Sequence, residues 1–459
     1  MSKVLNVQEF IDERPIGRFQ WTVAAVSFLI GGVDTYDIVA MGFAAPSVRE
    51  QWGVSAAALA PVMTASVVGT MLGSFFSGAV VARTTPKVGF LLATTLVGIC
   101  SLACMFADSV LHLGLLRLLT GIFIGIALPC LGPTLFEILP RRRVASILAL
   151  VGTGGAAGSV LCGITAAALL PTYGWHSLFL IGGIAPLVLA LLVATLVPEP
   201  LRYMVSEGYP AEKIRAVLRK VDPSAVIDAD RFKTSEVLNK ADGKGMALIM
   251  SRRYRLGTLM LWASQFCAML VYYTLMSFLP TLVKEAGASI SAASLITTLF
   301  TVGGLVGGLA LGVIMDRINK HTAVAAGFIL GAVAVVAAGQ VLGSVPVLAG
   351  CILLLGCTFY GAMSSGNVIA AEYYPASSRV SGAAWRNGVA RIGGILGPLM
   401  AGGLLQVGVH GPHIVALLAA PALVAGVTLL IKRTAGEPSL GDHAELSPPP
   451  PVALKSKAM

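Results

Sequence analysis

The chain has 459 residues, of which 56% are hydrophobic and only 12% are charged, and its formal net charge is +10. A chain this apolar is not expected to be a soluble protein of this size. The basic charge therefore has to be explained within a membrane protein before nucleic-acid binding is considered.

Long segments without charged residues follow one another along the chain and predict membrane-spanning helices. A span needs about 20 apolar residues. Some uncharged runs are long enough for one or two spans each. They occupy residues 51–82, 88–107, 144–198, 256–283, 286–315, 322–371 and 392–431. Turn formers split three of these runs, at 171–174, 343–346 and 410–413. With further helices at about 19–48 and 110–139, the sequence predicts an all-α polytopic membrane protein with twelve transmembrane helices.

The order of apolar and hydrophilic segments predicts five parts. The first is polar and lacks the apolar core of a cleavable signal. A later hydrophilic segment, which carries 12 of the 32 basic residues, separates six helices from the next six. We expect a cytoplasmic N-terminus, a six-helix bundle, a cytoplasmic central loop, a second six-helix bundle and a disordered cytoplasmic tail, at residues 1–18, 19–198, 199–255, 256–431 and 432–459.

Alternate connections between the predicted helices differ in basic residues. One side of the membrane receives 27 of the 32 Lys and Arg residues, the other receives only Arg49 and Lys284, and three lie within spans. Basic residues concentrate in cytoplasmic loops. This distribution predicts that both termini are cytoplasmic, and it explains the net charge without nucleic acid as a partner.

The two halves of the chain are similar in sequence. "GAVVARTTPK" (78–87) and "GVIMDRINKH" (312–321) align at an offset of 234. "FEILPRRRVAS" (136–146) and "AEYYPASSRVS" (371–381) share Glu-x-x-Pro, a basic residue and Val at an offset of 235 to 236. Such repeats predict two pseudo-symmetric six-helix bundles around a central cavity, as in major facilitator transporters.

The motifs resemble the major facilitator superfamily, which is marked by Gly-x-x-x-Asp-Arg-x-x-x-[Arg/Lys] between helices 2 and 3 and between helices 8 and 9. Within it, residues from about 20 to about 430 resemble the aromatic acid:proton symporter family. The matching motifs are "DTYD" with Gly-Phe (34–43), Arg-x-x-x-Gly-x-x-x-Gly from Arg117, "GWHS" from Gly174, "PEPLR" (198–202) and "EYYPASSRVSGAAWRNGVAR" from Glu372.

The resemblance implies a secondary active transporter, not an enzyme, that imports a benzoate- or hydroxybenzoate-type acid with H+ by alternating access. It implies a monomer in the inner membrane of a bacterium, with the acid, H+ and the lipid bilayer as partners and no cofactor. Three alternatives remain open: an importer of a non-aromatic carboxylate, an efflux pump for drugs or organic anions, and a non-transporting membrane sensor. Helix 5 lacks a proline between residues 144 and 170, unlike drug/proton antiporters, which favours uptake.

Three positions depart from the family pattern. Ala82 replaces the Asp of the first-half motif, whereas Asp316 keeps it in the second half. Thr35 stands where the helix 1 motif has Gly, and Ala390 precedes Arg391 where Gly is common. Ala82 bears on the strength of the cytoplasmic gate, and Thr35 bears on the substrate.

Asp34 and Asp37 lie three residues apart in the first predicted span and share a helical face. A carboxylate in a bilayer is costly, so a pair in one span points to proton uptake unless it is a structural polar pair. Arg117, in the fourth span, lies at a similar depth and closer to Asp37 than to Asp34. These three residues are the predicted proton-coupling site, although Arg117 could instead form a purely structural salt bridge.

Arg391 is a basic residue deep in the eleventh span, without an acid on its own helix. A guanidinium binds a carboxylate in bidentate geometry, so Arg391 is the predicted carboxylate site. Trp385, Tyr272 and Tyr273 could stack on an aromatic ring, or they could pack within the bundle. Arg386, nearer the cytoplasmic end, is expected to extend its charge to the membrane surface.

Charged residues at cytoplasmic helix ends are poorly placed to bind substrate but could join the halves when the cavity is closed to the cytoplasm. The predicted gating residues are Arg83, Glu137, Arg143, Asp316, Arg317, Glu372 and Arg379. The seven cysteines lie in apolar spans without metal-ligand spacing, so no metal or disulfide is expected.

Overall fold

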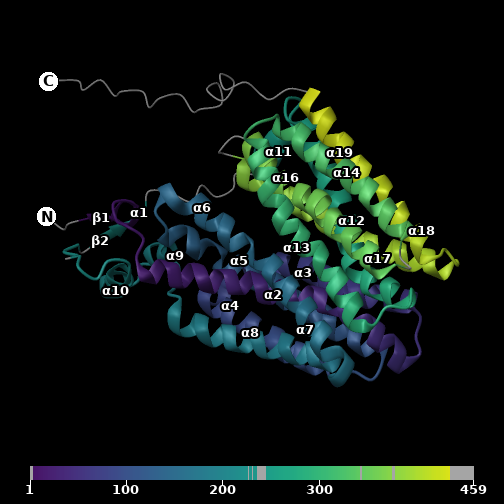
Figure 1. Cartoon of the computed structure of the whole chain (residues 1–459). Coiled ribbons are helices and arrows are strands. Elements are labelled where there is room, and N and C mark those ends of the chain that lie inside the picture. Colours follow the sequence, from purple (N-terminus) through teal and green to yellow (C-terminus); the bar gives the residue numbers. More distant parts are fainter. Residues whose placement is uncertain are drawn as a thin grey trace, which may run out of the picture.

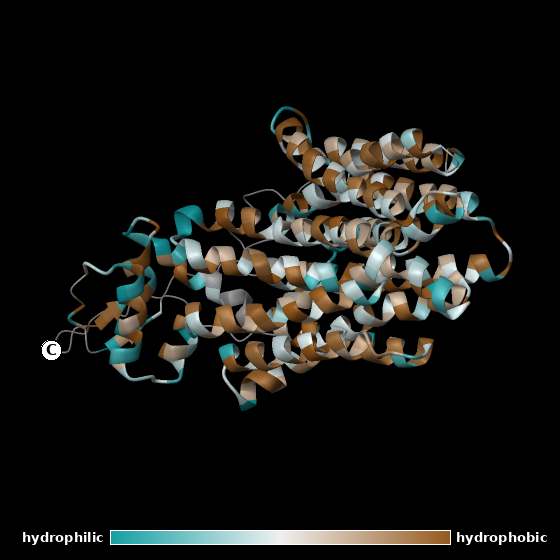
Figure 2. Cartoon of the chain, turned by 60° about the horizontal axis from the view of Figure 1, so that its bottom comes forward, coloured by the Kyte–Doolittle hydropathy of each residue, from teal (hydrophilic) through white to brown (hydrophobic). Residues whose placement is uncertain are grey.

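The computed structural model describes residues 4–225, 227–229, 231–234, 244–341, 344–374 and 378–434. Within this part of the chain, twelve helical segments are long and apolar enough to cross a membrane, which confirms the predicted all-α polytopic fold. The segments form two bundles that diverge toward the left of Figure 1. Hydrophilic residues gather at helix ends and in a small unit appended at the left of Figure 2.

The first bundle holds six spans. Its helices are α2 (Arg18–Trp52), α3 (Ala56–Arg83), α4 (Pro86–Cys104), α5 (Val110–Ile138), α6 (Arg141–Gly152) with α7 (Gly154–Tyr173) as one span, and α8 (His176–Leu196). Ser55, Thr85 and Ser109 begin α3, α4 and α5 by accepting backbone N–H groups of the first turn, which would otherwise lack partners.

The second bundle holds the other six spans, two of them composite. Its helices are α12 (Arg255–Glu285), α13 (Ile290–Met315), α14 (Lys320–Gln340), α15 (Val345–Leu355) with the π-helical turn η1 (Gly356–Tyr360) and α16 (Gly361–Tyr373), α17 (Arg379–Gln406), and α18 (Gly411–Leu417) with α19 (Ala419–Thr434).

The glycines that follow Arg117 bring α5 into close contact with α3. A Cβ atom on Gly121 would collide with the backbone of Ser66, and one on Gly125 would collide with that of Thr70. Small residues allow such close helix packing inside a membrane. The Ser66 hydroxyl donates to the Arg117 carbonyl oxygen at 3.1 Å. The Arg-x-x-x-Gly-x-x-x-Gly motif thus fixes the height of Arg117 against α3.

The two bundles pack together at one side of the molecule. We call the side where α2 and α12 begin the linker side, and the side where they end the opposite side. The packed pairs of helices are α2 with α12, α3 with α17, and α7 with α13. A Cβ atom on Gly42 would collide with the Met276 carbonyl oxygen, and one on Gly402 with the Ala60 side chain. These contacts lie toward the opposite side, whereas the ribbons diverge toward the linker side (Figure 1).

The central segment and the N-terminus form a small folded unit beside the first bundle. Strands β1 (Val4–Asn6) and β2 (Arg231–Lys233) pair in parallel. Its helices are α1 (Val7–Asp12), α9 (Leu201–Ser206) and α10 (Ala211–Val221). The last helix of the central segment, α11 (Lys244–Ile249), lies instead against α17 of the second bundle (Figure 1). These residues were predicted to form a terminus and a loop. The prediction did not include α10, which is amphipathic and buries one helical face, made by Ile214, Val217, Leu218 and Val221.

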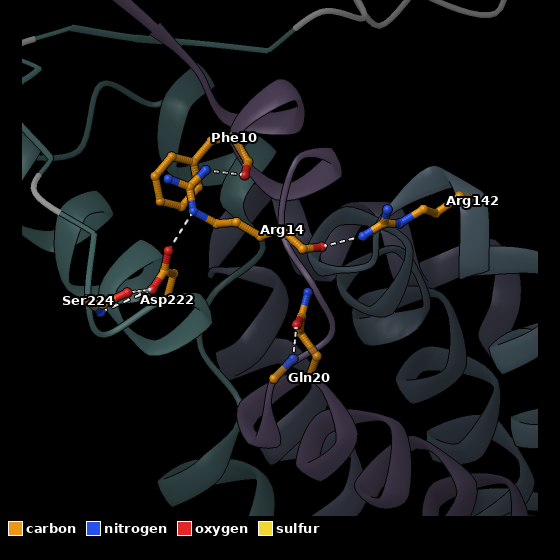
Figure 3. Close-up of polar contacts among 7 residues, drawn as sticks. Phe10, Arg14, Gln20, Arg142, Asp222 and Ser224 are labelled. Atoms are coloured by element: carbon orange, nitrogen blue, oxygen red, sulfur yellow. Dashed lines mark hydrogen bonds and ion pairs between the residues drawn. The ribbon is translucent and has the colours of Figure 1, made fainter.

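Arg14 attaches the N-terminal segment to the central segment (Figure 3). Its Nε donates to Asp222 at 2.7 Å, and its Nη1 donates to the Phe10 carbonyl oxygen at 2.6 Å. Arg142, at the start of α6, donates to the Arg14 carbonyl oxygen at 2.9 Å. The segment therefore contacts both the central region and the first bundle.

The Asp222→Asn variant is expected to loosen this attachment. Hydrogen bonds from Ser224 and from Arg14 hold the pKa of Asp222 below its ordinary value. A depressed pKa means that the contact stabilises the attached state at neutral pH and is lost as the pH falls through the lowered value. Hydrogen exchange of the α1 amides at pH 7 should accelerate about twofold or more in Asp222→Asn. Glu207→Gln, which changes an exposed acid outside this contact, is the control, and equal rates in all three proteins would contradict the account.

Candidate functional site

Asp37 and Arg117 form a fully buried ion pair between α2 and α5. The Arg117 Nη1 lies 2.8 Å from the Asp37 Oδ2, and its Nη2 donates to the Asp37 carbonyl oxygen at 2.6 Å. The Ser101 hydroxyl of α4 donates to the other carboxylate oxygen at 3.0 Å. The ring of Phe179, on α8, lies 5.6 Å below the guanidinium. Four helices of the first bundle therefore surround one neutralised pair of charges.

Asp34 lies one helical turn from Asp37, toward the linker side, and is only half-buried. Its Oδ2 is buried and has no hydrogen-bond partner in the described part of the chain. Burial of an unpaired charge is unfavourable. The two acids predicted for proton coupling thus have different surroundings, one paired with a cation and one not.

Arg391, on α17, reaches across to the first bundle. Its Nη1 donates to the Ser74 hydroxyl at 2.8 Å and to the Thr70 carbonyl oxygen at 3.3 Å, both on α3. No acidic side chain among the described residues lies within ion-pair distance of it. A half-buried guanidinium held by neutral oxygens keeps the capacity to bind a carboxylate.

The predicted aromatic residues separate into two places. Tyr273 is half-buried, and a Cβ atom on Gly394, about one helical turn after Arg391 on α17, would collide with its ring. This ring meets that of Tyr272 edge-on, with ring centroids 5.2 Å apart. Trp385 lies about 9 Å farther toward the linker side than Arg391, by the rise of α17. It stacks on Trp262 with ring centroids 6.1 Å apart. The structure therefore brings Tyr272 and Tyr273 to the neighbourhood of Arg391 and places Trp385 elsewhere on the same helix.

The predicted gating residues lie at the linker side, and among their described side chains no ion pair joins the two halves. Glu137 is buried and accepts the backbone N–H of Arg202, at the start of α9, at 3.0 Å. Glu372 pairs with Lys320 of its own bundle at 2.7 Å. Four of these residues are exposed and form no ion pair with the described part of the chain: Arg83, Arg143, Asp316 and Arg317. The side chain of Arg379 lies outside the described residues. Their gating role stays a prediction.

Two ion pairs at the opposite side are not among the interactions predicted from the sequence. Arg49, near the end of α2, pairs with Glu285, at the end of α12, at 2.6 Å. Lys284 pairs in turn with Glu50. The sequence offset of 235 that relates the two halves also relates Arg49 to Lys284 and Glu50 to Glu285. The repeat therefore produces a reciprocal pair of contacts, and this offset was the signal that could have revealed them.

Arg386 does not extend to the membrane surface as expected. Its side chain is buried and donates to the Asn367 Oδ1 at 2.7 Å and to the Gln265 Oε1 at 2.5 Å. The expectation was wrong because these two amides, on α16 and α12, offer acceptors inside the bundle. No sequence spacing connects these three polar residues, because they belong to three different helices.

Comparison with known proteins agrees with this architecture. The sequence model of the Major Facilitator Superfamily matches residues 26–225 and 261–458. A gallate transporter of Pseudomonas putida is 38% identical over 93% of this chain and 94% of its own length. A 4-hydroxybenzoate transporter of the same organism is 37% identical over 94% of this chain and 96% of its own length.

The benzoate transport protein of Acinetobacter baylyi is 28% identical over 94% of this chain and 93% of its own length. Among solved structures, a D-xylose-proton symporter shares the fold with a TM-score of 0.67 and 16% identity, over 89% of this chain and 97% of that one. These relatives are transporters, not enzymes. With twelve spans in two repeated bundles and a family match over most of its length, the chain belongs to the major facilitator superfamily.

Proposed function

We propose that this protein is a secondary transporter that imports an aromatic carboxylate of the benzoate or hydroxybenzoate type together with protons. The relatives named as gallate, 4-hydroxybenzoate and benzoate transporters support the substrate class. The observation that carries the proposal is Arg391, a guanidinium between the bundles whose described partners are all neutral. A carboxylate would supply the missing charge.

In this proposal Arg391 holds the carboxylate, and Tyr273 borders the bound acid. The present partners of Arg391, Ser74 and Thr70, belong to the other bundle. A substrate carboxylate would replace or share these weaker contacts, because a charge-assisted bidentate pair is stronger than hydrogen bonds to neutral acceptors. Substrate binding would thereby change a contact between the two bundles.

Proton coupling is assigned to Asp34, Asp37 and Arg117. Asp37 is paired with Arg117, and Asp34 has no such partner. Movement that separates Asp37 from Arg117 would leave a buried carboxylate, whose neutral form is then favoured. Alternation between a paired and an unpaired acid is what proton coupling requires.

Alternating access would occur by movement of the two bundles, residues 19–198 and 256–431, connected by residues 199–255. The positive-inside distribution supports a cytoplasmic linker side, with both termini there, and a periplasmic opposite side in a bacterial inner membrane. We assign the opposite-side ion pairs to a periplasmic gate. The cytoplasmic gate would use the residues predicted from the sequence: Arg83, Glu137, Arg143, Asp316, Arg317, Glu372 and Arg379. The transporter acts as a monomer in this proposal.

Arg391→Ala is expected to abolish binding of benzoate and 4-hydroxybenzoate, and Arg391→Lys to weaken it about tenfold or more, because an ammonium group lacks the bidentate geometry. Equilibrium binding of the labelled acids to purified protein measures the effect. Ser74→Ala, which removes only a neutral partner of Arg391, serves as the control and should change the affinity by about threefold at most. Near-parental affinity in Arg391→Ala would remove this residue from the site.

Asp37→Asn is expected to exchange internal for external substrate but to fail to accumulate it under an imposed pH gradient. Asparagine cannot ionise, so the variant stays in the uncharged state. Counterflow and pH-driven uptake in the same proteoliposomes separate the two activities. Removal of one member of a buried pair costs about 3–5 kcal/mol. The double variant Asp37→Asn/Arg117→Gln, in which both partners are neutral, therefore controls for lost stability.

Normal accumulation by Asp37→Asn together with failure of Asp34→Asn would move the proton site to Asp34. Accumulation with a normal pH response in both single variants and in Asp34→Asn/Asp37→Asn would make these acids structural. A parent protein that binds the acid but never accumulates it would favour the sensor alternative.

Arg49→Glu is expected to open the opposite side more often, because it replaces an attraction to Glu285 by a repulsion. Thr281, which is buried and lines the cavity beside these pairs, provides the reporter as Thr281→Cys. Its labelling in whole cells by a membrane-impermeant maleimide should accelerate roughly twofold to fivefold. The double variant Arg49→Glu/Glu285→Arg restores an ion pair of reversed polarity and should return the rate to that of the parent. Equal labelling in the single and double variants would argue against a gate.

A further inference from the structure

A π-helical turn interrupts the tenth span beside Arg391's aromatic neighbours. The turn η1 (Gly356–Tyr360) separates α15 from α16 and lies against a glycine-rich face of α13. A Cβ atom on Gly307 would collide with the backbone of Cys357, so the two helices are in backbone contact there. A π turn adds a residue to one turn of the helix and so changes the direction of the side chains that follow, and such turns are frequent at functional sites.

Tyr360, the last residue of this turn, joins an aromatic cluster with Tyr272 and Phe300. Its ring stacks on that of Tyr272 at 5.3 Å and on that of Phe300 at 5.6 Å. A Cβ atom on Gly304 would collide with the Tyr360 ring, so this glycine provides the space for it. Tyr272 and Phe300 are buried, whereas Tyr360 is only half-buried. Tyr360 is therefore the ring of the cluster that keeps accessible surface.

The cluster lies where the two bundles meet. The hydroxyl of Thr301, the residue after Phe300, lies 3.2 Å from the hydroxyl of Ser159, which belongs to α7 in the other bundle. Tyr273, whose ring lies against Gly394 about one helical turn after Arg391, meets Tyr272 edge-on. The rings thus form a continuous aromatic path from the turn of α17 that follows Arg391 to Tyr360.

We propose that Tyr360 is a specificity-determining residue, against whose ring the aromatic ring of the substrate packs while Arg391 holds the carboxylate. This inference rests on the proposed function. The physical advantage of such a contact is the attraction between aromatic rings, which a saturated ring of similar size and shape does not gain. Tyr360 would therefore select aromatic acids over saturated cyclic acids.

The test compares the dissociation constants of benzoate and cyclohexanecarboxylate, which share the carboxylate and nearly the same size. The parent protein should prefer benzoate by about threefold to tenfold. Tyr360→Leu should lose this preference, and Tyr360→Phe, which keeps the ring, should retain it. Gly304→Ala should lose it as well, because the added methyl group displaces the Tyr360 ring. The ratio of two dissociation constants from one preparation does not depend on the fraction of protein that is folded.

Phe359→Leu is the matched control. Phe359 precedes Tyr360, but it is buried against Phe328 of α14, with ring centroids 5.2 Å apart. Its loss should reduce the melting temperature without changing the preference. Retention of the preference in Tyr360→Leu, or its loss in Phe359→Leu, would overturn the inference while leaving the proposed function intact. Failure of the parent to bind either acid would instead overturn the proposed function.

Discussion

The cost of burying charge in a medium without water organises the first bundle. Neither Asp37 nor Arg117 could occupy its position alone, because an unpaired buried charge is strongly destabilising. Their contact joins α2 to α5, and it requires Arg117 to lie at one height. The close packing of Gly121 against α3 and the hydrogen bond from Ser66 set that height. The glycine motif thus positions Arg117 so that it can form the ion pair with Asp37.

The two arginines within the spans of the second bundle, one buried and one half-buried, have no acidic partner among the described residues. Arg386 donates to the amides of Gln265 and Asn367, which belong to the same bundle. Arg391 donates to oxygens of α3, which belongs to the other bundle. Movement of one bundle relative to the other would leave the contacts of Arg386 intact and would break those of Arg391. This difference in partners, rather than the presence of a buried arginine, distinguishes the cation suited to a ligand that must be bound and released.

The sequence was sufficient for features set by composition, periodicity and depth. The twelve spans followed from uncharged runs, and the proximity of Asp37 to Arg117 followed from the helical rise along two spans. It was insufficient where several partners are available to one side chain, as for Arg386. It was also insufficient where contact between the backbones of two helices determines the local helix geometry, as in the π turn 356–360. The fold of the central segment was missed because α10 is short and its amphipathic face is not a membrane signal.

The charged residues that join the bundles at the opposite side are repeated in the two halves, whereas one charged position at the linker side is not. At the opposite side, Arg49 and Lys284 occupy equivalent positions, so two reciprocal ion pairs join the bundles. At the linker side, Asp316 has only Ala82 as its counterpart. Because the opposite-side pairs are partly exposed, each contributes only about 0.2–1 kcal/mol. Contacts of this size bias the position of the bundles without locking it. A ligand that binds one arrangement more tightly by a few kcal/mol could then reverse the bias, which is the energetic condition for a transporter that must open on both sides.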